Sequence, residues 1–187
     1  SAELTPEVVD FLSAGTRTGI LAFTATDGRP LAAPVWFVVE DGEVVFNTGA
    51  TTAKGRALAR DARVALVVDV AQPPYAFVQV QGVAETSEDA GELVRTATAL
   101  GARYMGADRA EEYGRRNGVP GELVVRLRPT KVVASGGAFG EEDVDVGGPA
   151  LGEPRDHSGE IVGRHGQVVG PARGKAQQDA VTGAAGG

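Results

Sequence analysis

The sequence of 187 residues contains no cysteine and only two histidines, His157 and His165, both in its C-terminal part. The absence of cysteine excludes disulfide bonds and thiolate metal ligands, and it agrees with a reducing compartment. Residues 1–135 therefore lack both side chains on which Ser/His/Asp and Cys/His catalytic centres depend. We expect no catalytic side chain and no metal site, so a bound molecule would have to carry any reaction.

Basic charge and long apolar runs are also scarce. The net charge is −7, whereas a protein that binds nucleic acid needs a basic face. No apolar run approaches the length of a membrane span, and the N-terminus lacks the basic-then-apolar pattern of a signal peptide. We therefore expect a cytoplasmic protein that binds neither nucleic acid nor a membrane.

The pattern of the chain changes near residue 135. Before it, periodic apolar segments alternate with turns; beyond it, glycine becomes frequent and Phe139 is the only aromatic residue. Such a sequence buries too little apolar surface to offset the entropy lost on ordering. We predict a folded cofactor-binding domain over residues 1–135 and a flexible, Gly-rich tail over residues 136–187, with both histidines exposed and idle.

Turn and capping signals divide the first part of the domain into a helix and three strands. Thr5-Pro6 is typical of a helix start, and this helix should end before Gly15. Strands are predicted over residues 19–26, 31–40 and 43–47, because Asp-Gly pairs between them favour tight hairpins. A helix containing Lys54 follows and reaches about residue 60.

The second part predicts three more strands and two helices. The nearly continuous apolar run 63–70 suggests a strand buried on both faces, and residues 75–85 resume with alternation. Helices are predicted after a Ser87 cap and again before Asn117, and the last strand covers 121–127, extended by 132–133. Six consecutive strands without regular strand–helix alternation favour a mainly β fold with peripheral helices, most plausibly a small barrel, over a Rossmann sheet.

Residues 46–58, FNTGATTAKGRAL, carry the most recognisable chemistry of the domain. A strand ends in polar residues, a Gly/Thr loop follows, and a helix begins with Lys54 in its first turn. Free N–H groups, hydroxyls and a positive charge converge there, which suits a phosphate, although the Walker spacing is absent. The alternative for Lys54 is an ordinary surface lysine, and for Arg56 an ion pair with Asp61.

These segments resemble the pyridoxamine 5′-phosphate oxidase-like split barrels. The resemblance rests on Val45-Phe46-Asn47-Thr48 followed by Ala53-Lys54-Gly55-Arg56-Ala57-Leu58 and Asp61-x-Arg63. The chain is more closely similar to the branch that uses the deazaflavin coenzyme F420, through Pro34-Val35-Trp36-Phe37, Val80–Ala84 and Pro120–Lys131. The resemblance covers about residues 4–134. It implies a six-stranded antiparallel split β-barrel and a homodimer with cofactor sites at its interface.

The resemblance also assigns roles to residues of this chain. It makes Lys54 the ligand of the cofactor phosphate, and Arg56 is a further candidate. Other positions match the phosphate loop (Gly49, Thr51 and Thr52), the ring and ribityl chain (Asn47 and Thr48) and a strand along the ring (Pro34, Val35 and Trp36). For Trp36 a place in the core or at the dimer interface is an equal alternative.

The function implied by the resemblance is an F420-dependent oxidoreductase. It would transfer a hydride between reduced coenzyme and a small organic acceptor of the quinone, tetrapyrrole or enone type. Two departures from the FMN-dependent oxidases disfavour pyridoxamine phosphate oxidation and FMN: Ala53 stands where they carry arginine, and Phe77 where they carry glutamine. An FMN-binding oxidase or reductase of the same fold and a non-catalytic F420 carrier remain alternatives.

Overall fold

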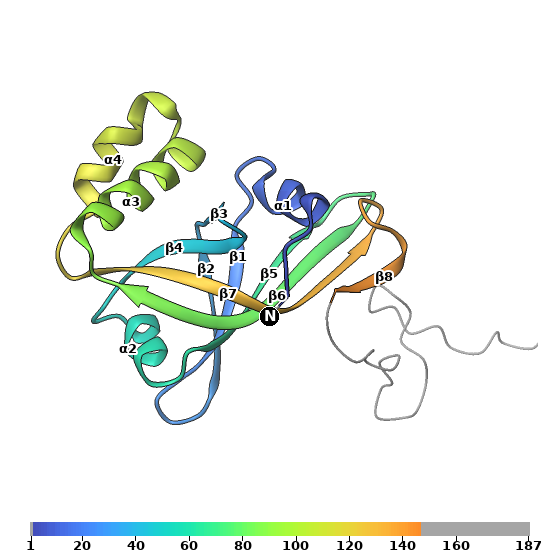
Figure 1. Cartoon of the computed structure of the whole chain (residues 1–187), viewed down its shortest axis with the longest axis horizontal. Coiled ribbons are helices and arrows are strands. Elements are labelled where there is room, and N and C mark those ends of the chain that lie inside the picture. The colour runs from blue at the N-terminus through green and yellow to red at the C-terminus, as the bar shows by residue number, and fades with distance from the viewer. Residues whose placement is uncertain (1, 147–187) are drawn as a thin grey trace, which may run out of the picture. The chain divides into compact units, whose positions relative to one another are not determined.

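A computed structural model of the chain describes residues 2–146 (Figure 1). Helix α1 (Pro6–Ser13) is followed by the strands β1 (Gly19–Thr24), β2 (Pro30–Val35), β3 (Val38–Glu40) and β4 (Glu43–Gly49). After helix α2 (Ala53–Arg60) come β5 (Arg63–Val70) and β6 (Ala76–Ser87), then α3 (Ala90–Met105), a 3₁₀ turn η1 (Ala107–Arg109) and α4 (Ala110–Asn117). The last two strands are β7 (Glu122–Gly136) and β8 (Gly140–Val146).

The strands form one antiparallel sheet in the order β2-β1-β5-β6-β7-β4-β3, with β8 paired to β7. Its first and last strands, β2 and β3, are consecutive in the chain and are joined only by Trp36 and Phe37. Within residues 2–146 no backbone ladder pairs β2 with β3, so the curved sheet is not closed. The predicted mainly β fold with peripheral helices, of the split-barrel type, is confirmed.

Residues 2–146 contain eight strands, whereas six were predicted. The predicted strand 31–40 is interrupted where Phe37 turns into the core, with none of its side chain exposed. The final strand continues through Pro129 beside a bulge at Gly82, where a Cβ atom would lie 2.1 Å from the carbonyl oxygen of Arg128. Glycine at position 82 therefore permits the two long strands to pass closely.

The predicted domain boundary at residue 135 falls where β7 leads into β8. Strand β8 lies in the stretch predicted as a tail, and it pairs with β7 from Val132↔Val146 to Gly136↔Gly140. Backbone pairing to an existing strand orders this segment although its sequence offers little apolar surface. Residues 147–187, which include both histidines, lie outside the described residues.

Local signals placed most helix and turn boundaries correctly. The hydroxyl of Thr5 caps α1 by accepting from the Val8 N–H at 3.4 Å. Asp41 and Gly42, both with positive φ, form the two-residue turn between β3 and β4. The cap of α3 is Asp89 rather than Ser87: its Oδ1 accepts from the Glu92 N–H at 2.7 Å, and Ser87 instead accepts from the Asp89 N–H.

The core lies on the inner face of the sheet, under α1 and α2. Its largest fully buried side chains are Leu12, Leu21, Phe37, Phe46, Leu66 and Leu127. The prediction that β5 is buried on both faces is wrong. Val64, Leu66 and Val68 are buried, whereas Ala65 and Val67 on the other face are only half-buried. An apolar outer face is therefore left open on a single chain.

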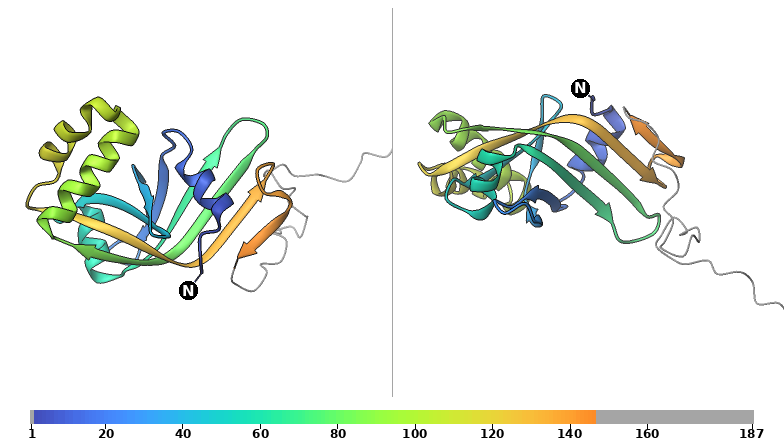
Figure 2. Two further views of the ribbon diagram at one scale, coloured as in Figure 1. Left: turned by 45° about the horizontal axis from the view of Figure 1, so that its top comes forward. Right: turned by 90° about the horizontal axis from the view of Figure 1, so that it is seen from below.

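Helices α3 and α4 lie at one end of this sheet (Figures 1 and 2). Figures 1 and 2 show α3 and α4 side by side at the end of the sheet where β6 ends and β7 begins. Most of the packing of α4 is against α3, through glycines; a Cβ atom at Gly114 would lie 2.0 Å from the Thr98 hydroxyl. No helix within residues 2–146 is both long enough and apolar enough to cross a membrane.

Candidate functional site

A cavity of about 230 Å³ lies between the β4–α2 segment and the α3–α4 hairpin. Its lining comes from six parts of the chain: Pro34, Val35, Trp36, Asn47, Lys54, Ala97, Leu100, Tyr113, Asn117 and Glu122. The structure thus brings together five of the ten predicted site residues, namely Pro34, Val35, Trp36, Asn47 and Lys54. Side chains far apart in sequence converge because the β2–β3 linker and β4 both end near the first turn of α2.

The first turn of α2 is positioned by Thr52. Its hydroxyl accepts from the Gly55 N–H at 3.0 Å and donates to the Gly49 carbonyl at 2.7 Å. A Cβ atom at Gly55 would lie 2.4 Å from the Gly49 carbonyl oxygen, so glycine lets the helix sit directly on the loop. The N–H groups of Ala53 and Lys54 have no acceptor within residues 2–146, and they remain available to an anion.

Lys54 is the one cationic side chain that lines the cavity. It is half-buried, and within residues 2–146 it has no hydrogen bond or ion pair. Desolvation by burial lowers the pKa of its ammonium group below the ordinary value of 10.5. Glu122 lines the same cavity but forms no ion pair with Lys54. A charge held away from water without a partner is suited to an anionic ligand.

Asn47 presents the second unsatisfied group. Both its Oδ1 and Nδ2 atoms are buried, and neither has a hydrogen-bond partner within residues 2–146. A buried amide without partners costs roughly 1–3 kcal/mol of folding free energy. Because Asn47 lines the cavity, a ligand there that offers both a donor and an acceptor would satisfy the amide.

The other five predicted site residues do not line the cavity. Thr48 is buried, with its hydroxyl 3.4 Å from that of Thr52, and the Thr52 hydroxyl is engaged as the helix cap. Gly49 ends β4. The carbonyl of exposed Thr51 accepts a hydrogen bond from Arg56, which lies along the outside of α2. Arg56 does not pair with Asp61, whose partner is Arg63 at 2.7 Å.

Aromatic rings form the wall at the β2–β3 linker. The Trp36 ring stacks on Tyr104, with centroids 4.7 Å apart and planes 3° from parallel, and Tyr113 lies 5.9 Å away at 36°. Trp36 is 38% exposed, so one part of its surface is packed and another is open. The structure therefore places Trp36 in the wall of the site rather than in the core.

Arg103 and Tyr104 of α3 fix this linker from behind. The Arg103 guanidinium donates to three backbone carbonyls, those of Leu12 at 2.7 Å, Gly15 at 3.0 Å and Phe37 at 2.6 Å. The Tyr104 hydroxyl donates to the Arg17 carbonyl at 2.8 Å and accepts from the Phe37 N–H at 3.2 Å. The backbone next to Trp36 is thus tied to both α1 and α3.

Half of the lining was not predicted as a site from the sequence. Ala97 and Leu100 lie three residues apart on α3, and Tyr113 and Asn117 lie four apart on α4, spacings that place each pair on one helix face. Glu122 opens β7 opposite Gly49. Helical spacing alone is equally typical of ordinary packing, so only the tertiary structure reveals these residues as cavity walls.

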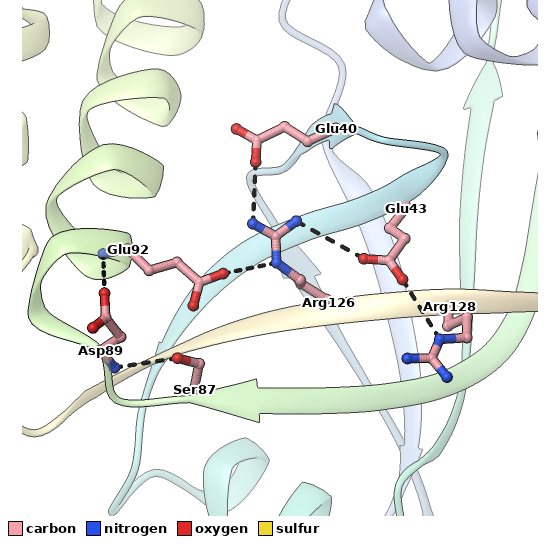
Figure 3. A network of polar contacts seen from close by, with 7 residues as sticks. All are labelled: Glu40, Glu43, Ser87, Asp89, Glu92, Arg126 and Arg128. Carbon is pink, nitrogen blue, oxygen red and sulfur yellow. Dashed lines mark hydrogen bonds and ion pairs between the residues drawn. The ribbon is translucent and has the colours of Figure 1, made fainter.

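A second cluster of polar groups lies beside the site and is fully partnered (Figure 3). Arg126 of β7 contacts Glu92 at 2.7 Å, Glu40 at 3.3 Å and Glu43 at 3.8 Å, and Arg128 contacts Glu43 at 3.6 Å. Hydrogen bonds from the Ser87 hydroxyl and from Arg126 lower the pKa of Glu92. This network ties α3 to β3, β4 and β7.

The polar groups that line the cavity are suited to binding a ligand rather than to acting as a nucleophile or a metal ligand. None of its ten lining residues is His or Cys, and no group of three His, Cys, Asp or Glu residues within 2–146 could hold a metal ion. An unpaired ammonium, helix N–H groups and an unsatisfied amide fit a cofactor that combines a phosphate with a ring whose edge carries hydrogen-bonding groups. The residues present therefore fit a flavin-type group.

Residues 4–135 match the family model described as pyridoxamine 5′-phosphate oxidase. This chain belongs to that family. The split-barrel fold, with its cavity between α2 and the α3–α4 hairpin, is the pyridoxamine 5′-phosphate oxidase fold in this protein. No protein with a curated description matches the chain.

Several solved structures share this fold. A conserved hypothetical protein from Mycobacterium tuberculosis is 26% identical, with a TM-score of 0.64 over 80% of this chain and 96% of that one. A heme-binding protein from Mycobacterium smegmatis is also 26% identical, with a TM-score of 0.55 over 73% of this chain and 56% of that one. An F420 reductase is 24% identical, with a TM-score of 0.54 over 68% and 98%.

Proposed function

We propose that this member of the family is an F420-dependent oxidoreductase that transfers a hydride between reduced coenzyme and an organic acceptor of the quinone, tetrapyrrole or enone type. The observation that carries the proposal is the pairing, in one cavity, of the unpartnered Lys54 ammonium with the unsatisfied Asn47 amide. The coenzyme, when bound, supplies the hydride. The chain supplies an anchor for the phosphate, partners for the ring edge and an aromatic wall that excludes water.

The charge at the anchor favours F420 over FMN. The phosphate of F420 is a diester with one negative charge, whereas that of FMN is a monoester carrying about −1.5 to −2 at neutral pH, as phosphomonoesters do. Lys54 is the one cation lining the cavity; its neighbour is Ala53, and Arg56 is folded against the Thr51 carbonyl. A single ammonium would neutralise the diester, whereas it would leave a net negative charge on the monoester.

Haem is the alternative raised by the heme-binding relative. Iron in haem proteins is held by His, Cys, Met or Tyr, and Tyr113 alone among the lining residues belongs to that set. The Lys54 ammonium suits a haem propionate as well as a phosphate, but it is not among the side chains that hold haem iron. The donor set therefore supports F420 in preference to haem.

Titration of the purified apoprotein with F420, FMN and haem in parallel tests the proposal. We expect the lowest Kd for F420, and tighter binding of FMN or haem would overturn it. Lys54→Ala should weaken F420 binding by about 1.5–3 kcal/mol, the value of a hydrogen bond to a charged group. Arg56→Ala, on the same helix, should change it less than about threefold, because exposed cations contribute little.

Turnover separates an enzyme from a carrier. Reduced F420 bound to the wild-type protein should be oxidised faster by at least one member of a panel of quinones, tetrapyrroles and enones than it is in free solution. Tight binding without acceleration for any member would favour the non-catalytic carrier.

We also propose that two copies of the chain associate through the open outer face of the sheet. Across β2, β1, β5 and β6 one row of this face reads Pro34, Ile20, Val67 and Gln79, and Ile20 is 43% exposed. Pro34 also lines the cavity, so a partner covering this row would complete the rim of the cofactor site. Sedimentation should show a dimer that Ile20→Asp dissociates; a monomeric wild-type protein would overturn this.

A further inference from the structure

The cavity has a second wall besides the Lys54 and Asn47 side chains that would hold the coenzyme. The α3–α4 hairpin provides this wall. Asn47 and Glu122 come from β4 and the start of β7, which pair at Gly49↔Glu122, and Lys54 comes from the first turn of α2. Tyr113 and Asn117 come from α4 and share the cavity with Trp36. One side is polar and charged, and the other is aromatic and uncharged.

Trp36 offers an open aromatic surface on that second side. Trp36 stacks on Tyr104 in parallel at 4.7 Å and approaches Tyr113 at 5.9 Å and 36°, and 38% of its surface stays exposed. Aromatic surfaces of this kind favour flat, conjugated ligands in offset stacking. The residues of this side, Trp36, Tyr113 and Asn117, carry no charge, so a neutral ligand fits best.

The Tyr113 hydroxyl differs from that of Tyr104 in having no partner. Tyr104 satisfies its hydroxyl with two backbone groups, whereas the Tyr113 hydroxyl makes no hydrogen bond within residues 2–146. The ring is nevertheless held in place. A Cβ atom at Gly101 would lie 2.6 Å from the Tyr113 Cβ, so α3 packs directly against it, and Asn117 donates to the Tyr113 carbonyl at 3.1 Å.

From these contacts we infer that the Trp36–Tyr113 side of the cavity binds the acceptor, a flat and neutral conjugated carbonyl compound, and that the Tyr113 hydroxyl donates a hydrogen bond to its carbonyl oxygen. This inference rests on the proposed function. A donor at that oxygen stabilises the negative charge that a carbonyl develops on reduction. Tyr113 is thereby a specificity-determining residue for acceptors that carry an oxygen.

The only tryptophan of the chain is Trp36, so its fluorescence reports binding at this wall directly. The probes are menadione, a flat quinone, and 2-methylnaphthalene, which has the same rings without the oxygens. Each is titrated against wild type, Tyr113→Phe and Tyr75→Phe, a tyrosine in the β5–β6 connection. Both apoprotein and protein saturated with oxidised F420 are used, so that no hydride transfer occurs.

We expect Tyr113→Phe to weaken menadione binding about fivefold, as for a neutral hydrogen bond, and to leave 2-methylnaphthalene binding unchanged. Tyr75→Phe should change neither. If Tyr113→Phe alters both probes equally or neither, or if neither probe quenches Trp36, the inference is overturned. A selective loss for menadione in a protein that does not bind F420 would support the role of Tyr113 while rejecting the proposed function.

Discussion

Two groups of polar side chains, each at the junction of the sheet with its helices, differ in how they are satisfied. Around Arg126 a central cation contacts three carboxylates, and each arginine and glutamate shown in Figure 3 has an opposite charge as partner. In the cavity, Lys54 and the Asn47 amide have none within residues 2–146. The ion pairs of the first group stabilise the folded chain without any ligand. The second costs folding free energy, and a ligand is what would offset that cost.

The largest expected effect is on the partnered group. Arg126→Met leaves Glu40 and Glu92 without their cation, while Glu43 keeps Arg128, and we expect the free energy of unfolding to fall by about 2–3 kcal/mol. This is less than for a fully buried pair, because about a quarter of the Arg126 side chain is exposed (26%). Urea denaturation monitored by circular dichroism measures the loss.

A matched arginine provides the control for that experiment. Arg115 pairs with Glu111 at 3.6 Å on the exposed surface of α4, where both side chains are well solvated. Arg115→Met should change the free energy of unfolding by less than about 0.5 kcal/mol. Equal losses of unfolding free energy in the two variants would show that the network around Arg126 stabilises the fold no more than an exposed ion pair does.

The opposite sign is expected for the unpartnered amide. Asn47→Leu removes two buried polar atoms that lack hydrogen bonds, so the apoprotein should gain about 1 kcal/mol in unfolding free energy while its affinity for F420 falls. Asn117→Leu removes an amide that donates to the Tyr113 carbonyl, and it should destabilise the apoprotein. A loss of stability in Asn47→Leu would contradict the view that the unsatisfied Asn47 amide costs folding free energy.

The smallest expected effect is a dependence on pH. Burial lowers the pKa of Lys54 in the folded state below 10.5, so between that lowered pKa and 10.5 the unfolded chain binds more protons than the folded one. The unfolding free energy contributed by Lys54 therefore rises with pH across this window and is constant above it. Thermal unfolding of wild type and Lys54→Met from pH 8 to 11 should show this rise as a difference between them. Parallel curves would mean that Lys54 is not desolvated.

The elements that local chemistry determines were predictable, and those that depend on distant contacts were not. Thr5, the Asp41-Gly42 turn and the helix at Lys54 were identified because caps and tight turns are encoded within a few residues. Strand β8 was missed because its order comes from pairing with β7 rather than from its own composition. Strand β5 appeared doubly buried because its sequence cannot say that one face is left open.

The site divides in the same way. Lys54 and Asn47 were identified through the order of a strand, a loop and a helix, and the structure places both in the cavity. Thr51 and Thr52 were expected in the phosphate loop, but neither lines the cavity. The sequence could not show that the Thr52 hydroxyl donates to the Gly49 carbonyl instead. Tyr113 and Asn117 could not be recognised, since their value to the site comes from the packing of α4 on α3.

Arg103 has a consequence for how this protein tolerates mutation. The three atoms that it grips, on Leu12, Gly15 and Phe37, are all backbone oxygens. Any residue at these positions that keeps the same backbone path supplies the same acceptor, so substitutions there leave the contact itself intact. The position of the cavity wall therefore depends on the backbone of these residues and not on their side chains. Substitutions in α1 that keep its backbone path should leave the site unchanged. Arginine suits this arrangement because Nε, Nη1 and Nη2 each donate to a different carbonyl, whereas the three donors of a lysine lie on a single nitrogen.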